Sequence, residues 1–418
     1  MPKKQDKEAV IAKALSMLEK GEIKPYRLEE VTHDEGLATE ARRRYIERKR
    51  NVKLVHVSRS SIDFNDATNR NIENAIGAVQ VPVGYAEILV NGTYLRGTTP
   101  IFLATTEGRL VAGVNRGAAV LNKSGGVTTR IINTGMTRSV ILEFHSIADS
   151  VKALEYINSE EGRELIGDAF KESNKRLSLA GIDTFTTGRL LFLRYSANTA
   201  AAMGMNMVTI ASTSVTKKVI EALAKKGINA VFLSESGNMC ADKKPSAINV
   251  IKGRGISVVA EAVVKKEVLQ EYFNADAKKI EEVNYAKNYI GSSLAGSLAH
   301  NAHIANILAA TFIAYGQDVA QIVDGVNAID DARALGSDLY ISVYIPALEV
   351  GTYGGGTHRE TAKELLIASG VYGEGDEQGV TKYGLAELIA AGVLAGELNL
   401  LAAEAGQELS SAHASLKK

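Results

Sequence analysis

Two adjacent lysines, Lys243 and Lys244, stand between Asp242 and Pro245 in a segment of small residues. Because proline cannot continue a helix, we expect this segment to form a loop. A lysine held beside a reacting carbonyl stabilises the oxyanion that hydride addition creates, and it can donate a proton to that oxygen. The segment therefore predicts reductive carbonyl chemistry, and a solvated turn with two lysines is the alternative interpretation.

A candidate acid, Glu107, stands between Thr106 and Gly108, shortly after the apolar run 101–104. A carboxyl group at the end of a strand can be partly desolvated, which raises its pKa and lets it hold a proton at neutral pH. Glu107 is therefore a candidate proton donor. A solvated loop glutamate is the alternative that these residues leave open.

Arginines that could bind an acidic ligand follow at Arg116, Arg130 and Arg138, the first of them within Asn115-Arg116-Gly117. The planar guanidinium donates two parallel hydrogen bonds, which suits carboxylates and phosphates. These residues predict a ligand that carries such groups. Surface ion pairs are the alternative for any one arginine.

Composition excludes several other classes of protein. The 48 Lys and Arg residues balance 48 Asp and Glu residues, which argues against a mainly electrostatic nucleic-acid binder. The single cysteine, Cys240, excludes an intramolecular disulfide framework and a cysteine-built zinc site, as expected in a reducing cytosol. His300 and His303 lack a nearby acidic residue, so we predict no metal site.

Redox chemistry in this chain would have to use a bound cofactor, because one cysteine provides no dithiol. No GxGxxG motif follows a strand, so the Rossmann route predicts no nicotinamide cofactor. The run from Met203 to Met207 places three sulfurs at alternating positions, and by pattern alone it is more typical of a pliable core patch than of a cofactor site.

The elements that must position these residues change in type along the chain. Apolar residues spaced three and four apart predict a helix over 6–20, and a very charged helix is expected over 38–50, together a helical amino-terminal unit. From 139 to 233 strand-like and helical runs alternate, which predicts a compact α+β insert. Strands are expected at 79–85, 87–90, 101–105, 140–144, 190–195, 229–232 and 339–345, and helices at 146–158, 162–177, 203–226 and 383–405.

One charge-free run, residues 288–317, is long enough to cross a bilayer. Serine, histidine and asparagine interrupt it, and alanine and glycine dominate it, so we predict a helix buried in protein, not in a membrane. The amino terminus lacks the apolar run of a signal peptide, and we expect a cytoplasmic protein. On a continuous helix Asn306 and Asp318 would lie about 18 Å apart, so either the helix breaks or two chains share pockets.

Several segments, taken together and in order, resemble the 3-hydroxy-3-methylglutaryl-coenzyme A (HMG-CoA) reductase family. The resemblance covers the chain from about residue 50 to its end and looks closest to the soluble, archaeal-type class I. Several matched segments in family order are far more specific than any single one. The matching segments are 73–77, 81–84, 104–108, 115–117, 135–138, 203–207, 242–245, 301–318 and 351–357.

The resemblance implies a fold, a reaction and an assembly. The implied reaction is reduction of HMG-CoA to mevalonate and coenzyme A with two molecules of NADPH. Homodimers or homotetramers with active sites between chains are implied, with no nucleic-acid or membrane partner. The implied fold is α+β, with a helical N-terminal unit (1–50), a large mixed α/β substrate domain (51–138 and 234–400), an inserted small ferredoxin-like cofactor domain (139–233) and a mobile C-terminal tail (401–418).

The resemblance also implies a role for each matched residue. Glu107 is the implied proton donor and Lys243 the cation at the carbonyl oxygen. Asp318 bridges and tunes both, and His413 protonates the departing coenzyme A thiolate. The implied substrate-binding residues are Asn115, Arg116, Gly117, Arg138, Ser236, Lys244 and Asn306. The implied cofactor-binding residues are Asn174, Lys175, Arg176, Met203, Gly204, Met205, Asn206 and Met207.

Two departures from the family pattern affect the cofactor side. The family has Gly-Asp before its Ala-Met-Gly-Met-Asn run, whereas this chain has Ala200 and Ala201, so we expect weaker cofactor binding. Relatives have Ser-Arg for the 2′-phosphate, whereas this chain has Asn174-Lys175 followed by Arg176; positive charge remains, and NADPH is favoured over NADH. Two alternatives stay open: an acyl-coenzyme A binding protein that has lost catalysis, and a degradative enzyme that oxidises mevalonate with NAD.

Overall fold

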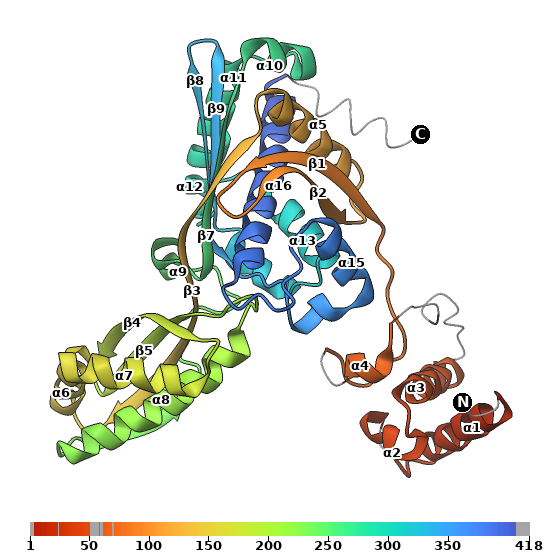
Figure 1. Ribbon diagram of the computed structural model, residues 1–418, viewed down its shortest axis with the longest axis vertical. Coiled ribbons are helices and arrows are strands. Elements are labelled where there is room, and N and C mark those ends of the chain that lie inside the picture. The colour runs from red at the N-terminus through yellow and green to blue at the C-terminus, as the bar shows by residue number, and fades with distance from the viewer. Residues whose placement is uncertain (1–3, 24, 51–57, 59–61, 69–70, 407–418) are drawn as a thin grey trace.

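The computed structural model describes residues 4–23, 25–50, 58, 62–68 and 71–406. Figure 1 shows a mixed α+β fold in which helices pack around a twisted sheet. Within the described residues the strands are β1 Val83–Asn91, β2 Arg96–Ala104, β3 Val127–Phe144, β4 Ser178–Thr187, β5 Leu190–Asn198, β6 Ala230–Ser234, β7 Gly255–Val264, β8 Ile329–Leu335 and β9 Asp338–Leu348.

The helices connect and cover these strands. They are α1 Lys4–Glu19, α2 Glu29–Thr32, α3 Glu35–Arg50, α4 Phe64–Thr68, α5 Leu110–Lys123, α6 Ile147–Asn158, α7 Glu160–Ser173, α8 Met205–Lys225, α9 Ala247–Lys252, α10 Lys266–Phe273, α11 Ala277–Asn284, α12 Ser292–Ala295, α13 Ile304–Ala314, α14 Ile322–Gly325, α15 Glu360–Ala368 and α16 Val380–Ala405. Short turns of 3-10 helix occur at Pro25–Arg27, Val319–Gln321 and Gly355–His358, and a π-helix at Tyr285–Gly291.

Strand β3 belongs to two parts of the sheet. Its first half pairs with β1 and β7 in the order β2-β1-β3-β7-β9-β8, and the last of these pairs joins Gly135 to Gly255. Its second half pairs with β5 and β6 in the order β4-β5-β3-β6, starting at Met136 opposite Ala197. A single strand of 18 residues therefore links the two parts covalently and by hydrogen bonds.

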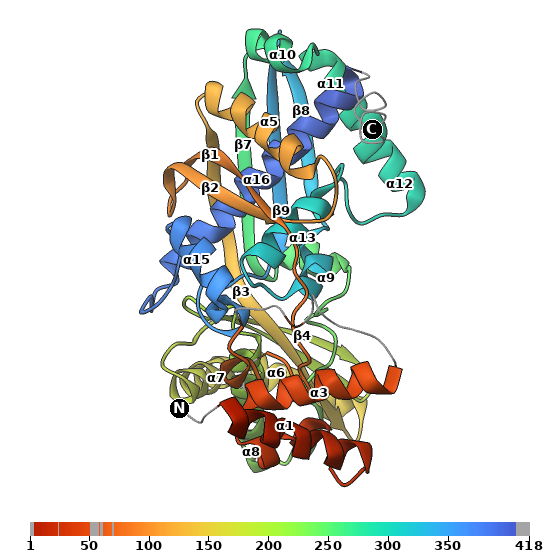
Figure 2. The same cartoon turned by 90° about the vertical axis from the view of Figure 1, so that its right-hand side faces the viewer.

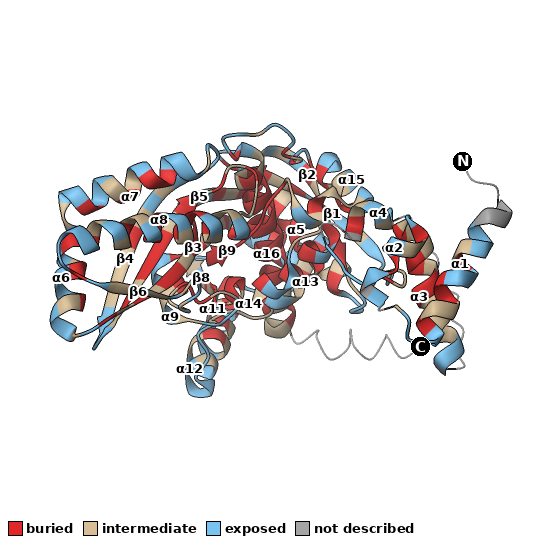
Figure 3. Ribbon diagram, turned by 90° about the horizontal axis from the view of Figure 1, so that it is seen from below, coloured by how far each residue is buried: buried red, intermediate tan, exposed pale blue. Residues whose placement is uncertain are grey.

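The described hydrophobic residues form three separate cores. The largest surrounds α16, which Figure 3 shows as the most continuously buried helix. A second core lies between α6, α7, α8 and the β4-β5-β3-β6 strands, and a small third core holds α1 and α3 together. Figures 1 and 2 place the α1–α3 group apart from the large core. The domain boundaries inferred from the sequence stay a prediction.

Helix α16 is long and apolar because it passes through the middle of the large core. It has the length and composition of a membrane-crossing helix, but 89% of its most apolar 18-residue stretch is buried inside the structure. Gly117 of α5 lies against it so closely that a Cβ atom there would overlap the carbonyl oxygen of Ala395. The absence of a side chain at Gly117 therefore sets the separation of α5 and α16.

Most predicted elements are confirmed, with shifts of a few residues at their ends. The two separate strands expected at 79–85 and 87–90 are wrong, because these residues form one continuous strand, β1, that begins at Val83 and pairs with β2 along its whole length. The single buried helix expected over 288–317 is wrong. The π-helix and α12 end at Gly296, whose φ of 70° is left-handed, and α13 runs only from Ile304 to Ala314. Leu294 on α12 is 86% exposed, so this piece is not buried in the chain itself. The helix breaks, and Asp318 lies beyond its end.

We predict that Gly117→Ala lowers the free energy of unfolding by at least about 2 kcal/mol, because the added methyl group has no space between α5 and α16. Urea unfolding followed by circular dichroism measures this change. The matched control is Gly167→Ala on α7, where nothing lies within 4 Å of the added atom. That substitution should raise stability by about 0.5–1 kcal/mol. Equal effects of the two substitutions would contradict the packing explanation.

Candidate active site

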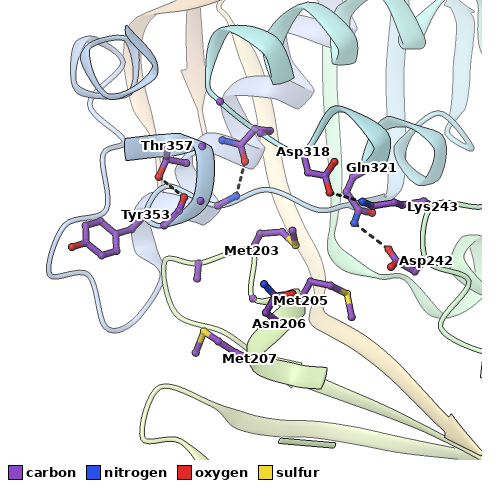
Figure 4. A pocket seen from close by; sticks show the side chains of 18 of the residues that line it. Met203, Met205, Asn206, Met207, Asp242, Lys243, Asp318, Gln321, Tyr353 and Thr357 are labelled. Atoms are coloured by element: carbon purple, nitrogen blue, oxygen red, sulfur yellow. Dashed lines mark hydrogen bonds and ion pairs between the residues drawn. The ribbon is translucent and has the colours of Figure 1, made fainter. Parts of the chain in front are cut away.

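Lys243 and Asp318 form an ion pair at the edge of an open cavity of about 470 Å³. Lys243 Nζ lies 2.8 Å from Asp318 Oδ2, and the two side chains are 42% and 38% exposed. Figure 4 shows the pair on one side of the cavity and the segment from Met203 to Met207 on the other. An ammonium group at this position can stabilise negative charge on an oxygen bound in the cavity.

Residues 241–245, which we call the lysine loop, have a backbone held in an unfavourable conformation. Ala241 and Lys243 have left-handed φ angles of 49° and 57°, a region that costs non-glycine residues about 1–2 kcal/mol each. The carboxylate of Asp324 compensates, because it accepts hydrogen bonds from the backbone amides of Lys243 (3.1 Å) and Lys244 (3.2 Å). Backbone contacts therefore fix the direction in which Lys243 leaves the loop.

A fully buried arginine, Arg254, joins the groups behind this loop. It donates to Asp324 Oδ2 (3.1 Å) and Glu349 Oε1 (3.0 Å), and lies 3.0 Å from Asp242 Oδ1. Gln321 accepts from Arg254 and donates to Asp242. Burial raises the pKa of Glu349 well above its usual range, although the nearby Arg254 acts in the opposite direction. The raised pKa favours the protonated form of Glu349, which reduces the excess negative charge around Arg254.

Asp318 owes its position to the end of α13. The chain leaves this helix through Gly316, whose left-handed φ of 63° and close contact with the carbonyl of Gly356 exclude a side chain. Asp318 then caps the next turn by accepting from the amide of Ala320 (3.2 Å). Gln317 Oε1 accepts from the amide of Gly351 (2.8 Å), which ties this turn to the glycine-rich segment 351–357.

Three predicted substrate-binding residues, Arg138, Ser236 and Lys244, lie in or close to the lysine loop. Arg138 lines the cavity, and its Nη1 donates to Ser236 Oγ (3.0 Å) while its Nε donates to Thr209 Oγ1 (2.9 Å). Lys244 Nζ donates to the carbonyl of Asp242 (3.2 Å) and does not line the cavity. The chain thus brings Arg138, Ser236 and Lys243 close together, and their roles toward a substrate stay a prediction.

Glu107 and Asn306 form a second, separate cluster, which we call the glutamate half-site. Asn306 Nδ2 donates to Glu107 Oε1 (3.2 Å) and lies 3.3 Å from His303 Nδ1. Neither Glu107 nor Asn306 lines the Lys243 cavity in this single chain. Glu107 is exposed, not partly desolvated, because β2 ends at Ala104 and Glu107 lies beyond the strand.

The predicted coenzyme A contact at 115–117 lies on α5. Asn115 is exposed, whereas Arg116 donates to the carbonyl of Tyr272 and lies 4.6 Å from the ring centroid of Phe273. Gly117 is buried against α16. Packing therefore accounts for Gly117, and the ligand contact of this segment stays a prediction.

The segment from Met203 to Met207 forms a wall of the cavity and begins α8. Gly204 has a left-handed φ of 89°, and a Cβ atom there would overlap the side chain of Thr199. The glycine is therefore required by the turn that directs the amino end of α8 to the cavity (Figure 4). Free backbone amides at such a helix start favour negatively charged ligands.

Arg176 lines a smaller cavity of about 110 Å³ that shares Ala202, Met207 and Tyr353 with the larger one. Asn174 ends α7 and accepts from the amide of Arg176 (2.8 Å). Lys175 is exposed. These residues therefore place positive charge beside the Met203–Met207 segment.

Several residues of the site were missed by sequence reasoning. Arg254, Asp324, Glu349 and the buried Lys382 were not singled out, because no local pattern marks a buried charge whose partners lie far along the chain. Lys382 donates to Thr199 Oγ1 (2.9 Å) and to the carbonyl of Ala202 (3.2 Å), directly behind the cofactor-side turn. The run 351–357 was noted only within the family resemblance, and Tyr353 and four glycines of that run line the cavity.

Two further predictions concern His413 and a metal site. His413 lies outside the described residues. Among the residues that the structure does describe, no group of three or more His, Cys, Asp or Glu side chains is arranged to hold a metal ion.

The α+β fold holds a lysine–aspartate pair beside a glycine-walled cavity, an arrangement that can bind a small molecule and polarise a carbonyl oxygen. In fold, the chain is similar to the class II 3-hydroxy-3-methylglutaryl-CoA reductase from Streptococcus pneumoniae bound to NADPH. The TM-score is 0.61 at 18% identity, over 96% of this chain and 97% of that one.

Sequence comparison identifies the family. The model named hydroxymethylglutaryl-coenzyme A reductase matches residues 38–418. The 3-hydroxy-3-methylglutaryl-coenzyme A reductase of Pyrococcus horikoshii is 44% identical over 96% of this chain and 97% of its own length. That of Methanocaldococcus jannaschii is 44% identical over 95% of this chain and 96% of its own length. The chain belongs to the hydroxymethylglutaryl-coenzyme A reductase family, which confirms the resemblance inferred from its segments.

We predict that Asp324→Asn lowers the free energy of unfolding by about 3 kcal/mol, because it leaves Arg254 buried with one ionised partner fewer. The midpoint of urea unfolding measures this loss. The control is Asp331→Asn, which removes an exposed ion pair with Arg333 and should leave the midpoint unchanged. A midpoint equal to wild type in Asp324→Asn would contradict the role assigned to the buried network.

We predict that Lys382 makes stability rise with pH above neutrality. Burial lowers the pKa of Lys382 from 10.5 to about 8, so the folded chain loses this proton before the unfolded chain does. The free energy of unfolding therefore increases between about pH 8 and 10.5, by up to about 3 kcal/mol. Lys382→Met should be more stable than wild type at pH 7, with the difference shrinking toward pH 10. A difference that does not vary with pH would contradict this prediction.

Proposed function

We propose that this chain reduces HMG-CoA to mevalonate and coenzyme A, using two molecules of NADPH. The carrying observation is the Lys243–Asp318 ion pair, whose ammonium group faces a cavity walled by backbone amides and glycines. Two carbonyl reductions in succession need one group that stabilises an oxyanion twice, and a lysine held by a carboxylate can do this. The family membership reported above supports the same reaction.

In this proposal each charged residue has one task. Lys243 stabilises the oxygen of the thioester and then that of the aldehyde. Asp318 keeps the lysine charged and oriented, Glu107 supplies the proton, and His413 protonates the thiolate that leaves. Arg138, Ser236, Lys244 and Asn306 hold the hydroxymethylglutaryl group, and Asn115, Arg116 and Gly117 contact coenzyme A.

The residues of the cofactor side fit a dinucleotide with phosphates. The amino end of α8 and glycines 354–356, which lack side chains, let a cofactor approach the backbone closely. Arg176 adds positive charge for a 2′-phosphate. When bound, the nicotinamide supplies hydride. We further infer that residues 139–233 form a ferredoxin-like cofactor domain, which the strand order β4-β5-β3-β6 supports.

Ala201 stands where the family pattern has an aspartate, and the missing carboxylate supports weaker cofactor binding. Ala201 is buried, and its carbonyl accepts from the amide of Thr352 (2.8 Å). Ala200 beside it has a left-handed φ of 50°, a conformation that glycine adopts more easily. The backbone of the turn is thus held by its neighbours, but no acidic side chain at 201 faces the cavity.

We also propose that two chains complete each active site, in a homodimer or homotetramer in the cytoplasm. The Lys243 cavity and the glutamate half-site each hold only part of the predicted constellation. Apolar side chains beside the break in the 288–317 region are exposed in the single chain, with Leu294 86% and Ile290 44% accessible. Such side chains are typical of surfaces that a partner covers.

The test is NADPH oxidation, followed as absorbance, with HMG-CoA as substrate and mevalonate counted as product. We expect two NADPH oxidised per mevalonate formed, faster with NADPH than with NADH. Lys243→Ala should lower kcat at least about 1,000-fold, because the oxyanion loses its main stabilising charge. The matched control Lys265→Ala removes a surface lysine paired with Asp338 and should retain full activity.

The alternatives give different results in the same assay. Binding of HMG-CoA without oxidation of either nucleotide would favour a binding protein that has lost catalysis. Oxidation of mevalonate with NAD, faster than reduction of HMG-CoA with NADPH, would favour a degradative enzyme. Either result would reject the proposed reaction.

A further inference from the structure

We propose that Glu397 is a positioning residue for the glutamate half-site, which it orients through the backbone turn that begins α13. Glu397 lies on α16 and its side chain is completely buried. Its Oε2 accepts from the amide of Ala302 (2.7 Å) and its Oε1 from the amide of His303 (2.8 Å). The inference rests on the proposed function, because it gives Glu397 a role in the reduction of HMG-CoA.

The turn held by Glu397 carries the side chains of the half-site. His303 is the residue before α13, and its own side chain does not cap the helix. Its Nε2 lies 3.0 Å from the carbonyl oxygen of Gly396, and its Nδ1 lies 3.3 Å from Asn306 Nδ2. Asn306 in turn donates to Glu107 (3.2 Å). A shift of this turn therefore moves His303 and, through it, Asn306, the side chain that donates to Glu107.

The carboxylate also serves the helix that it faces. The first amides of α13 have no partner within the helix, and a negative charge at this end is favourable. Glu397 supplies both the acceptor and the charge from a different helix. Asn301 Oδ1 accepts from the amide of Ile304 (3.4 Å), and Glu397 accepts from the two amides just before it. The start of α13 is therefore fixed both by its own sequence and relative to the core around α16.

A second buried carboxyl group supports Glu397 from the far side. Burial and the neighbouring Glu397 raise the pKa of Asp330 well above its usual range, so Asp330 is favoured in its protonated form. Asn288 Nδ2 lies 3.4 Å from Asp330 Oδ2, and Asp330 accepts at its backbone carbonyl from Tyr289. Protonation of Asp330 explains how its carboxyl group can lie beside that of Glu397 in a core.

Glu387, on the same helix, separates a positioning role from a purely structural one. It is also completely buried, and it accepts from the amides of Thr93, Tyr94 and Leu95 in the β1–β2 turn. No predicted site residue lies in that turn. Replacing Glu387 should therefore reduce stability as replacing Glu397 does, without moving the half-site.

The size of the expected effect follows from the distances involved. In Glu397→Gln, the amide oxygen can accept from one backbone amide, but the new NH₂ group faces the second donor. The turn must then move to separate these groups. Displacement of a catalytic group by about 1 Å can lower a rate by up to about 100-fold.

The experiment compares Glu397→Gln with Glu387→Gln in the full-length protein. Stability is measured by urea unfolding, and kcat and KM are measured for HMG-CoA and NADPH separately. We expect both variants to lose stability. Only Glu397→Gln should lower kcat/KM for HMG-CoA at least tenfold, with KM for NADPH within twofold of wild type. Equal losses of activity in both variants, or a change on the NADPH side instead, would overturn the proposal.

A double-mutant cycle makes the coupling explicit. If Glu397 acts through the turn that carries Asn306, Glu397→Gln should add little to the loss caused by Asn306→Ala, whereas Glu387→Gln should be independent of it. Full additivity of Glu397→Gln and Asn306→Ala overturns the proposal. If Glu397→Gln does not fold, Glu397→Asp, which keeps the charge on a shorter side chain, takes its place in both comparisons.

A readout without turnover separates this inference from the proposed function. Amide hydrogen exchange of peptides that contain residues 302–306 should accelerate in Glu397→Gln and stay unchanged in Glu387→Gln. HMG-CoA affinity, measured by calorimetry, should fall at least tenfold in Glu397→Gln only. If wild type binds HMG-CoA but oxidises no nucleotide, the proposed function fails while these two measurements still decide the role of Glu397; unchanged exchange and affinity would reject it.

Discussion

The interaction on which the site depends is the burial of one guanidinium group. Arg254 has no exposed surface, and a buried charge must be paired by groups that the fold brings to it. Its partners come from the lysine loop (Asp242), from α14 (Asp324), from the end of β9 (Glu349) and from the start of α8 (Met205, whose Sδ lies 2.9 Å away). The lysine loop, the segment after α13 and the start of α8, which all line the cavity, are thus tied to one side chain.

Helix α16 ties distant backbone turns to the core, as Arg254 ties together side chains from distant elements. Along one buried helix, Glu387 and Glu397 accept hydrogen bonds from five backbone amides of two turns. Lys382, near the start of the helix, donates to the turn behind Met203. Carboxylates and an ammonium group in a hydrophobic helix are tolerated because each is satisfied by a turn that would otherwise have unpaired polar groups.

These two networks also explain what the sequence could predict. The lysine loop, Glu107 and Arg138 were found because their chemistry is visible in a few neighbouring residues, and the strands and most helices followed from local spacing. The break between Gly296 and Ile304 was only one of two alternatives, because Glu397, which holds the turn before α13, lies more than 90 positions away. Arg254 was missed for the same reason. The separation of Glu107 from Lys243 within one chain could not be read from composition, because it depends on the path of whole elements.

Strand β3 determines how the two sides of the cavity are placed relative to each other. Its hydrogen-bonded partners change at Gly135, where φ is 151° and a Cβ atom would overlap Ser196 Oγ, so this junction requires glycine. Arg138 lies just beyond that point on the same strand. The position of Arg138 relative to Lys243, and with it the width of the cavity, therefore depends on the backbone angles at one residue. A side chain at position 135 would change those angles and so the distance between the two sides of the cavity.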